Sequence, residues 1–379
     1  MAAPAVFLSS SLPMNAEQEI RKERLFRREL LNWYAGSHRP LPWKEARDPY
    51  VIWLSEVILQ QTRVQQGLPY FKRFLERFPR VEDLAAASQE EVLKLWEGLG
   101  YYSRARNMHH TAQYISRERG GRFPETYKEL LSLKGVGPYT AAAIASFAFD
   151  LPHAVVDGNV FRVLARFFGI DLPIDGSEGK KYFSALAGRL LDPGNPGRYN
   201  QAIMDFGATH CTPRNPLCST CLLQEDCYAF GEQRVSELPV KAKKLVKKER
   251  FFHYLVLQYG QSVFLRKRVE KDIWQHLFEF PLIETPRPLT RTEELAGQPR
   301  WRQYVGDIPY EVSQVSPPFQ QTLTHQKITA RFWKLQLQEP PPLEKHSLLE
   351  ANRKNLRKFA FPKIIDCYLQ DKSLYLNLS

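Results

Sequence analysis

Cysteine is scarce in this sequence. The chain has five cysteines in 379 residues, and four of them lie between positions 211 and 227. A chain of this length can build an apolar core, so it does not depend on disulfide bonds for stability. The scarcity disfavours a disulfide scaffold, and the grouping of the four thiols predicts a cofactor or metal site.

Long apolar runs and early basic residues are also missing. No apolar run approaches the ~20 residues needed to cross a bilayer. No Lys or Arg precedes Arg21, so the weakly apolar start lacks the basic flank of a signal peptide. We therefore expect a protein with no membrane partner that is not secreted, and we interpret residues 1–23 as a loose tail.

Acidic residues are fewer than basic ones. The chain has 53 Lys and Arg against 41 Asp and Glu, a formal net charge of +12. This excess favours a nucleic acid or another anionic surface as partner. Residues 241–250 contain six basic residues and one acidic residue. That run is either a solvated linker or a DNA contact, and the sequence leaves both readings open.

The four grouped cysteines, Cys211, Cys218, Cys221 and Cys227, have the spacing C-x6-C-x2-C-x5-C. Four thiolates suit either a structural zinc or an iron–sulfur cluster, because both prefer sulfur ligands. Zinc sites usually pair two C-x2-C units, and only Cys218 and Cys221 form one here. The asymmetric spacing favours one [4Fe–4S] cluster.

The pattern of apolar residues along the chain changes near residue 250. From about 24 to 229, apolar residues recur with helical spacing. From about 251 the pattern predicts strands, with a hairpin turn near Gly260, an alternating segment over 331–337 and a last helix around 352–369. We predict a mainly α fold: a helical domain over 24–230, a basic linker over 231–250 and a smaller α+β domain over 251–379.

Two local patterns could bind DNA. In the first, Gly135 and Gly137 form a tight turn before Pro138, which is well placed to start a helix. Such a turn directs N–H groups outward and can hold a phosphate, although a plain helix–turn–helix would look the same. The second combines the rings of Tyr101 and Tyr102 with Arg104 and Arg106. Rings can stack on bases and guanidinium groups can bind phosphates, whereas a buried tyrosine pair is the ordinary alternative.

Two carboxylates stand out by their surroundings. Glu56 is the single charged residue between Asp48 and Arg63. Burial there would raise its pKa, as a general acid at neutral pH requires, although a buried, hydrogen-bonded Glu would also fit. Asp157 follows an apolar pair and precedes Gly-Asn-Val, a pattern typical of a helix N-cap.

Several motifs, in this order and spacing, resemble the helix-hairpin-helix DNA glycosylase superfamily and, more narrowly, the MutY-type adenine DNA glycosylases. The motifs that carry the likeness are Leu41-Pro-Trp, Trp53-Leu-Ser-Glu-Val-Ile-Leu-Gln-Gln-Thr, Gly98-Leu-Gly-Tyr-Tyr-Ser-Arg-Ala-Arg and Val156-Asp-Gly-Asn-Val. The likeness is dense over about 25–230. It implies a two-lobed glycosylase domain with an iron–sulfur loop over 211–227.

The resemblance implies base-excision repair: removal of adenine mispaired with 8-oxoguanine or guanine, after the base is flipped out of double-stranded DNA. Glu56 would protonate an adenine ring nitrogen, and Asp157 would stabilise the oxocarbenium-like sugar. Tyr139 and Asn159 would support them. Trp43, Lys44 and Gln201 would contact the adenine, although Arg is usual at position 44 and some members have Glu at 201. The implied DNA contacts are Gln61, Thr62, Leu99, Tyr101, Arg104, Gly135, Gly137, Thr324 and His325.

Position 139 separates two classes within the superfamily. The bifunctional relatives of endonuclease III carry a lysine there, whose amine attacks the sugar and leads to strand cleavage. Tyr139 offers no amine, so the resemblance implies a monofunctional glycosylase.

Residues 251–379 resemble the Nudix-like module of the same family. Leu323-Thr324-His325 falls where the family has Phe-Ser-His, and the segment lacks the regular glutamates with which Nudix hydrolases bind magnesium. We therefore expect this module to recognise 8-oxoguanine rather than to hydrolyse a nucleotide.

Two other functions compete with this interpretation. One is an endonuclease III-like pyrimidine or mismatch glycosylase, which Glu56 disfavours because thymine gains less than a purine from ring protonation. The other is a non-catalytic DNA-binding iron–sulfur protein, which has no use for two buried carboxylates. We expect a monomer, acting at the nucleoid of a bacterium or in the nucleus or mitochondrion of a eukaryote.

Overall fold

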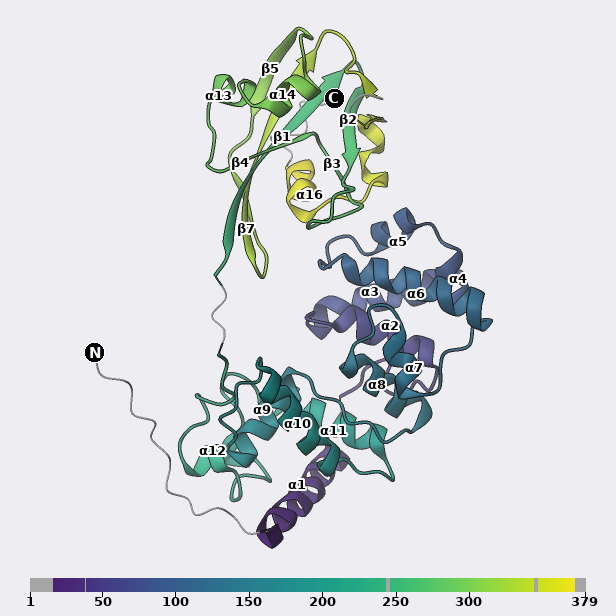
Figure 1. The fold of residues 1–379 in the computed structure, drawn as a ribbon, viewed down its shortest axis with the longest axis vertical. Helices are drawn as coiled ribbons and strands as arrows, with labels where there is room; N and C mark the ends of the chain where they lie inside the picture. Colours follow the sequence, from purple (N-terminus) through teal and green to yellow (C-terminus); the bar gives the residue numbers. More distant parts are fainter. Residues whose placement is uncertain (1–15, 38, 243–245, 344–346, 372–379) are drawn as a thin grey trace, which may run out of the picture. The chain divides into compact units, whose positions relative to one another are not determined.

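The computed structural model describes residues 16–37, 39–242, 246–343 and 347–371. Contacts divide the chain into two compact units, one over 1–56 and 123–243 and the other over 57–122 and 244–379. The predicted domains over 24–230 and 251–379 do not coincide with these units, because residues 57–122 are grouped with the C-terminal part of the chain. Figure 1 labels the helices and strands of both units.

The first unit is helical. Its elements are α1 (Ala16–Gly36), most of α2 (Pro49–Leu59), α7 (Tyr127–Ser132), α8 (Pro138–Phe149), α9 (Gly158–Phe168), α10 (Ser177–Leu190), α11 (Pro196–Thr209), η1 (Cys218–Thr220) and α12 (Tyr228–Gly231). Its core includes the apolar face of α9, where Val160, Val163, Leu164 and Phe167 are buried.

The hairpin between α7 and α8 forms as predicted. Gly135 has φ +82, which a residue with a side chain rarely adopts. Gly137 is the N-cap of α8, and Pro138 is the first residue of that helix.

The helical part of the second unit consists of α3 (Val64–Arg77), α4 (Val81–Ala86), α5 (Gln89–Leu95) and α6 (Ser103–Arg119). Helix α4 packs along α6, which begins directly after the Gly98–Tyr102 loop. This part holds the loop between α2 and α3, where Gln61 and Thr62 lie.

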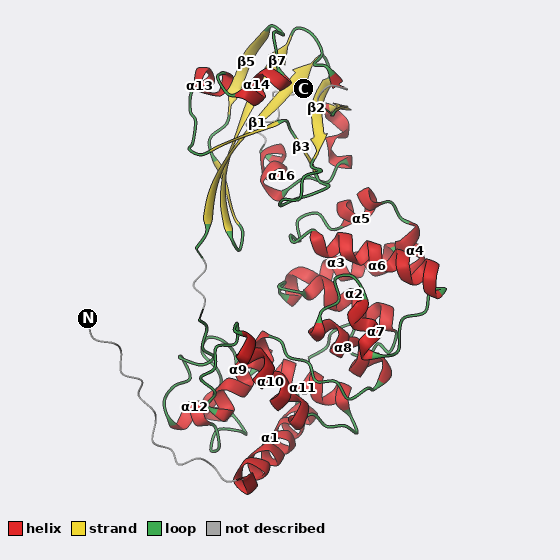
Figure 2. Ribbon diagram, in the orientation of Figure 1, coloured by secondary structure: helices red, strands yellow, loops and turns green. Residues whose placement is uncertain are grey.

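The rest of the second unit is built on an eight-stranded sheet (Figure 2). Its elements are β1 (Lys248–Tyr259), β2 (Ser262–Lys267), β3 (Phe278–Glu279), β4 (Leu282–Thr285), α13 (Thr292–Ala296), α14 (Pro299–Tyr304), β5 (Tyr310–Val315), β6 (Phe319–Thr322), β7 (Gln326–Leu337), β8 (Leu348–Asn352), η2 (Arg353–Lys358) and α16 (Lys363–Gln370). Strands β1 and β2 form the hairpin predicted at Gly260.

The sheet order is β3-β2-β1-β7-β5, with β4, β6 and β8 pairing with β1, β7 and β2. Among the described strands, only β1 and β7 pair in parallel, in the register Lys248–Gln326 to Gln258–Gln336. This register brings the start of β1 beside the Leu323–His325 turn, where the Lys248 amide donates to the His325 carbonyl over 2.9 Å.

Two predicted boundaries differ from the structure. Helix α1 begins at Ala16, so residues 16–23 are helical and not part of a loose tail; Glu17 and Glu19 in its first turn favour this start through the helix dipole. Residues 1–15 lie outside the described residues. The last predicted helix, over 352–369, forms as η2 and α16, because the residue before Pro362 disfavours helical backbone.

Both ends of the predicted linker over 231–250 pack against other parts of the chain. Arg234 pairs with Asp171 at 2.6 Å, and the Val240 carbonyl accepts from the Ile174 amide, so the segment up to Ala242 packs on the first unit. At the other end, β1 starts at Lys248, and Arg250 pairs with Asp272 and Glu284.

Candidate active site

Glu56 lies on α2 among buried apolar residues and is itself 8% exposed. Burial raises the pKa of its carboxyl group to about 7, and the nearby Asp157 adds to this rise. A hydrogen bond with the Tyr139 hydroxyl acts in the opposite direction but does not cancel it. Glu56 can therefore carry a proton at neutral pH and give it up, as a general acid must.

Asp157 is the N-cap of α9, as predicted. Its Oδ1 accepts from the amides of Asn159 and Val160, both at 2.8 Å, and its Oδ2 accepts from the Asn159 side chain at 2.7 Å. These three donors fix the orientation of the carboxylate at the positive end of the helix. Burial nevertheless raises the pKa of Asp157 above its ordinary value.

Tyr139 lies in the first turn of α8, and its hydroxyl, which hydrogen bonds to Glu56, also lies 3.3 Å from Met204 Sδ. Burial and the neighbouring carboxylates raise its pKa, which keeps the phenol neutral. The fold thus brings together side chains from α2, α8 and α9: Tyr139 hydrogen bonds to Glu56, and the charge of Asp157 acts on both of them.

Arg162 links Asn159, a hydrogen-bond partner of Asp157, to the cysteine loop. Its NH2 donates to Asn159 Oδ1 at 2.9 Å and to the Gly207 carbonyl at 2.6 Å, and its Nε donates to the Cys211 carbonyl at 2.8 Å. Arg162 is not among the residues predicted from the sequence. Its place one helical turn after Asn159 is a signal that could have found it.

Lys44 and Gln201, two of the residues predicted to contact adenine, meet at a buried carboxylate. Asp205 on α11 is 1% exposed and pairs with Lys44, and with Arg39 at 3.0 Å. Gln201 Nε2 donates to the same carboxylate at 3.3 Å. Trp43, the third predicted contact, is buried. Asp205 was missed by the sequence analysis, although it is a lone charge in an apolar stretch of the helix.

The four cysteines surround one apolar pocket of the first unit, which is also lined by Arg166, Phe167 and Leu223. None forms a disulfide bond. Arg166 NH1 donates to Cys211 Sγ at 3.4 Å, and to the Thr212 carbonyl at 2.8 Å. Among the described residues, no group of three or more His, Cys, Asp or Glu side chains has the arrangement for a single metal ion. A four-thiol donor set around one pocket fits a [4Fe–4S] cluster, for which the cysteines would be the ligands.

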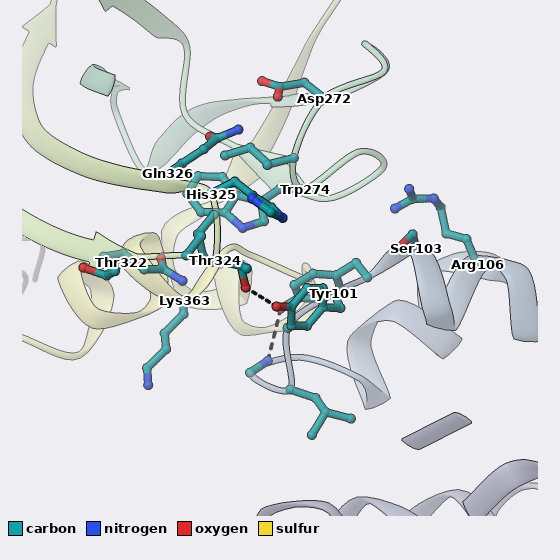
Figure 3. Close-up of a pocket in the computed structure, with 17 residues that line it drawn as sticks. Tyr101, Ser103, Arg106, Asp272, Trp274, Thr322, Thr324, His325, Gln326 and Lys363 are labelled. Atoms are coloured by element: carbon teal, nitrogen blue, oxygen red, sulfur yellow. Dashed lines mark hydrogen bonds between the residues drawn. The ribbon is translucent and has the colours of Figure 1, made fainter. Parts of the chain in front are cut away.

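A cavity of about 440 Å³ lies in the second unit (Figure 3). Leu99 and Tyr101 line it from the Gly98–Tyr102 loop, and Thr324 and His325 line it from the β6–β7 turn. The hydroxyl groups of Tyr101 and Thr324 hydrogen bond to each other. Leu99 is buried, whereas Tyr101 is 45% exposed. Residues predicted from separate motifs thus meet in one pocket.

The remaining predicted DNA contacts have different environments. Gln61 is exposed, and Thr62 is partly buried beside it. Gly135 is exposed, and the position of a Cβ at Gly137 would meet no atom within 4 Å. Arg104, in contrast, is only 9% exposed and donates to protein groups through NH1 and NH2. The guanidinium group of Arg104 is thus bound by protein acceptors in this structure, and its contact with DNA stays a prediction.

Three family models match this chain. Residues 54–185 match the HhH-GPD superfamily of base excision DNA repair proteins, residues 211–227 match the iron–sulfur binding domain of endonuclease III, and residues 253–371 match a NUDIX domain. The adenine DNA glycosylase of Buchnera aphidicola subsp. Schizaphis graminum is 38% identical over 262 residues, 69% of this chain and 76% of that protein. The chain belongs to the adenine DNA glycosylase family.

Other relatives extend the match. The adenine DNA glycosylase of Mus musculus is 34% identical over 385 residues, covering 88% of this chain and 75% of its own length. Among solved structures, a thermostable thymine-DNA glycosylase is similar over 56% of this chain and 99% of its own, with TM-score 0.53 and 31% identity. An endonuclease III bound to DNA is similar over 58% of this chain and 99% of its own, with TM-score 0.50 and 25% identity.

These matches confirm the predicted fold class of this adenine DNA glycosylase family member, a helix-hairpin-helix glycosylase fold followed by a Nudix-like domain. They also confirm the prediction of a base-excision DNA N-glycosylase with an iron–sulfur cluster at the four cysteines. No helix among the described residues has the length and apolar character to span a membrane.

Proposed function

We propose that this adenine DNA glycosylase excises adenine opposite 8-oxoguanine or guanine in double-stranded DNA, acting as a monomer on chromosomal DNA. The observation that carries the proposal is the pair formed by Glu56, with a pKa near 7, and Asp157, held at the start of α9. One carboxyl group that can donate a proton and a second that is oriented by three hydrogen bonds match the division of roles in glycosidic cleavage.

The proposed reaction starts with the adenine extruded from the helix. Glu56 donates its proton to a ring nitrogen of adenine, and the glycosidic bond breaks with its electron pair moving to the base. Asp157 faces the positive charge that develops on the sugar and stabilises it. Water then adds to the sugar carbon and loses a proton, which leaves free adenine and an abasic site.

Lys44, Gln201 and Trp43 are proposed to contact the adenine. Their support is the shared network at Asp205, which holds Lys44 and Gln201 side by side. Hydrogen-bonding groups held in fixed positions discriminate between bases more strongly than a plain apolar pocket does.

The base opposite the adenine is proposed to enter the cavity of the second unit. Its volume of about 440 Å³ lies in the range of small-ligand pockets. Tyr101 offers a ring for stacking, while Thr324 and His325 offer polar groups that can distinguish 8-oxoguanine from guanine. Gln61, Thr62, Leu99 and the Gly135–Gly137 turn are proposed to contact the surrounding DNA.

The likeness to a thymine-DNA glycosylase and to endonuclease III keeps a pyrimidine glycosylase as the second candidate. Glu56 disfavours it, because protonation assists the departure of a purine more than that of thymine. Tyr139 further supports a monofunctional enzyme, since a neutral phenol cannot form a Schiff base.

The test is a release assay on duplexes with A opposite 8-oxoguanine, G, C or T and with T opposite G, read with and without alkali. We expect adenine release from the first two duplexes only. Glu56→Gln and Asp157→Asn should each abolish release but retain binding, because they remove a proton or charge and little volume. Glu178→Gln, an exposed charge change on α10, is the matched control. Release of thymine, or near wild-type rates in either variant, would refute the assignment.

A further inference from the structure

Arg104 is a buried cation without an acidic partner among the described residues. It lies in the first turn of α6 and is 9% exposed. Burial lowers the pKa of its guanidinium group to about 10, so it remains charged at neutral pH. A buried, unpaired charge is costly, so the groups around it are expected to be arranged to stabilise it.

Those groups come from two loops and one helix end. NH1 donates to the carbonyls of Val57, Ile58 and Gln60, at 2.9, 2.8 and 2.7 Å. The first two belong to the last turn of α2, where a positive charge also satisfies the helix dipole. NH2 donates to Thr62 Oγ1 at 3.3 Å and to the Gly100 carbonyl at 3.2 Å.

Two of these acceptors directly precede residues in left-handed backbone. Gln61, which follows Gln60, has φ +54, and Tyr101, which follows Gly100, has φ +50. Residues with side chains adopt this conformation at a cost, and they persist in it only where the surrounding structure holds them. The planar guanidinium group holds the peptide before each strained residue.

The aromatic rings on either side add to the same arrangement. The Arg104 guanidinium carbon lies 5.0 Å from the ring centroid of Trp96 and 5.6 Å from that of Tyr101. The Trp96 indole N–H also donates to the Gly100 carbonyl at 2.9 Å. One side chain thus contacts the Tyr101 ring, the peptide that carries it and the peptide that carries Gln61.

We infer that Arg104 is a positioning residue that sets the spacing between Gln61 and Tyr101 and joins both to the end of α2, the helix that carries Glu56. The inference rests on the proposed function, in which Gln61 and Tyr101 contact the DNA at the mispair. In this role Arg104 needs no DNA contact of its own. It holds the two contacting residues at a fixed distance from each other. Because it also binds the end of α2, the insertion of these residues into the base stack is coupled to the position of Glu56.

Arg104→Lys is the decisive variant. It keeps the charge and can still cap α2, but a single ammonium group cannot bind both loops as a planar guanidinium does. Arg117→Lys, on an exposed position of the same helix, is the matched control. Arg104→Gln provides a second variant that keeps a donor but removes the charge.

The first measurement is hydrogen exchange of the DNA-free protein. We expect Arg104→Lys to raise exchange about tenfold or more over residues 60–62 and 98–102, with little change in the core of either unit. Exchange that rises throughout the chain, together with loss of visible cluster absorbance, would mean that Arg104 serves general stability, and would overturn the inference. Unchanged exchange in both loops would also overturn it.

The second measurement uses a duplex with A opposite 8-oxoguanine and 2-aminopurine beside the 8-oxoguanine, which fluoresces more when it is unstacked. In Arg104→Lys we expect a smaller fluorescence rise and about tenfold slower adenine release at saturating protein, because misplacement by about 1 Å can cost this much. Affinity for undamaged duplex should not change. If wild type releases no adenine, the proposed function fails, whereas the exchange measurement still decides the role of Arg104.

Discussion

Burial of the Glu56 carboxyl group supplies the proton for catalysis at neutral pH and lowers the stability of the folded protein there. Its surroundings raise the pKa from the ordinary 4.5 to about 7. The proton that catalysis needs is therefore present at neutral pH, while the ionised form of the buried group is unfavourable.

We expect the single-turnover rate of adenine release to fall as pH rises through about 7, because the acid form of Glu56 is lost there. The same group makes the folded protein less stable above that pH, since stability is full below the unfolded pKa of 4.5 and falls as pH rises through 7. The free energy of unfolding of Glu56→Gln should thus rise relative to that of wild type as the pH increases from 4.5 to 8.5, by about 3 kcal/mol for a pKa shift of this size. A rate profile that is flat from pH 6 to 8.5 would contradict the role of Glu56.

Position 139 decides whether an amine can reach the sugar. Tyr139→Lys should create strand nicking without alkali and a borohydride-trapped covalent complex, provided that burial lowers the lysine pKa enough to free its lone pair. Wild type should leave an intact abasic strand and give little trapped complex. Tyr139→Phe is the control that changes the residue without adding an amine. Efficient nicking by wild type would show that another residue acts as the lyase amine.

At the scale of elements, we expect the cysteine loop to depend on its cofactor for order. The segment between Cys211 and Cys227 contains only the short η1 helix, and it connects to α9 through Arg166 and Arg162. We expect a segment with so little regular structure to hold one conformation when its four cysteines bind the cluster.

Purified protein is expected to be yellow-brown, with about four irons per chain. Cys218→Ser should lower the iron content and loosen the Thr212–Leu217 segment, in which the exposed Arg214 is predicted to meet phosphate. Cys367→Ser, which changes the exposed cysteine outside the loop, should leave the iron content unchanged. Stoichiometric zinc without visible absorbance would contradict the cluster.

The hairpin between α7 and α8 offers a separate test of DNA binding. A Cβ at Gly137 would meet nothing within 4 Å, and the backbone there is not left-handed. Gly137→Ala should therefore keep the thermal stability of wild type but weaken duplex binding several-fold, if a phosphate approaches the backbone at this point. Gly135→Ala is the contrasting variant, because φ +82 makes it unstable in the absence of DNA as well. Unchanged binding by Gly137→Ala would remove this turn from the interface.

On the scale of the whole molecule, the second unit joins segments that are far apart in the sequence. The Phe361 amide donates to Glu97 over 2.8 Å, and Lys94 donates to the Phe359 carbonyl over 3.0 Å. Residues 57–122 would lose these partners in a chain cut at residue 251. Substitutions in the full chain are therefore a cleaner test of recognition than truncation.

Thr324→Ala combined with His325→Ala should reduce the preference for A opposite 8-oxoguanine over A opposite G, because both polar side chains in the turn are removed from the cavity. The rate on A opposite G should change little, since Glu56 and Asp157 are untouched. Competition between the two duplexes in one reaction measures the ratio directly. An unchanged ratio would mean that the oxidised base is recognised elsewhere, with Gln61 and Thr62 as the next residues to test.

Local chemistry in the sequence was sufficient for several features. Cysteine spacing, the N-cap at Asp157, the glycine turn before Pro138 and the strand hairpin at Gly260 each depend on neighbouring residues, so a short window contains the physical cause. The family motifs identified the carboxylate pair in the same way.

The tertiary structure decided what depends on distant segments. The pKa of Glu56 is set by burial and by Asp157, the Lys44 and Gln201 side chains meet at Asp205, and Tyr101 meets Thr324 only through the fold. Arg104 was predicted to contact DNA, and in the structure it holds two loops from inside. Desolvation and long-range hydrogen bonds require the whole packed chain, so the sequence by itself determined which groups this protein carries, and only the fold determined their protonation, their partners and their accessibility.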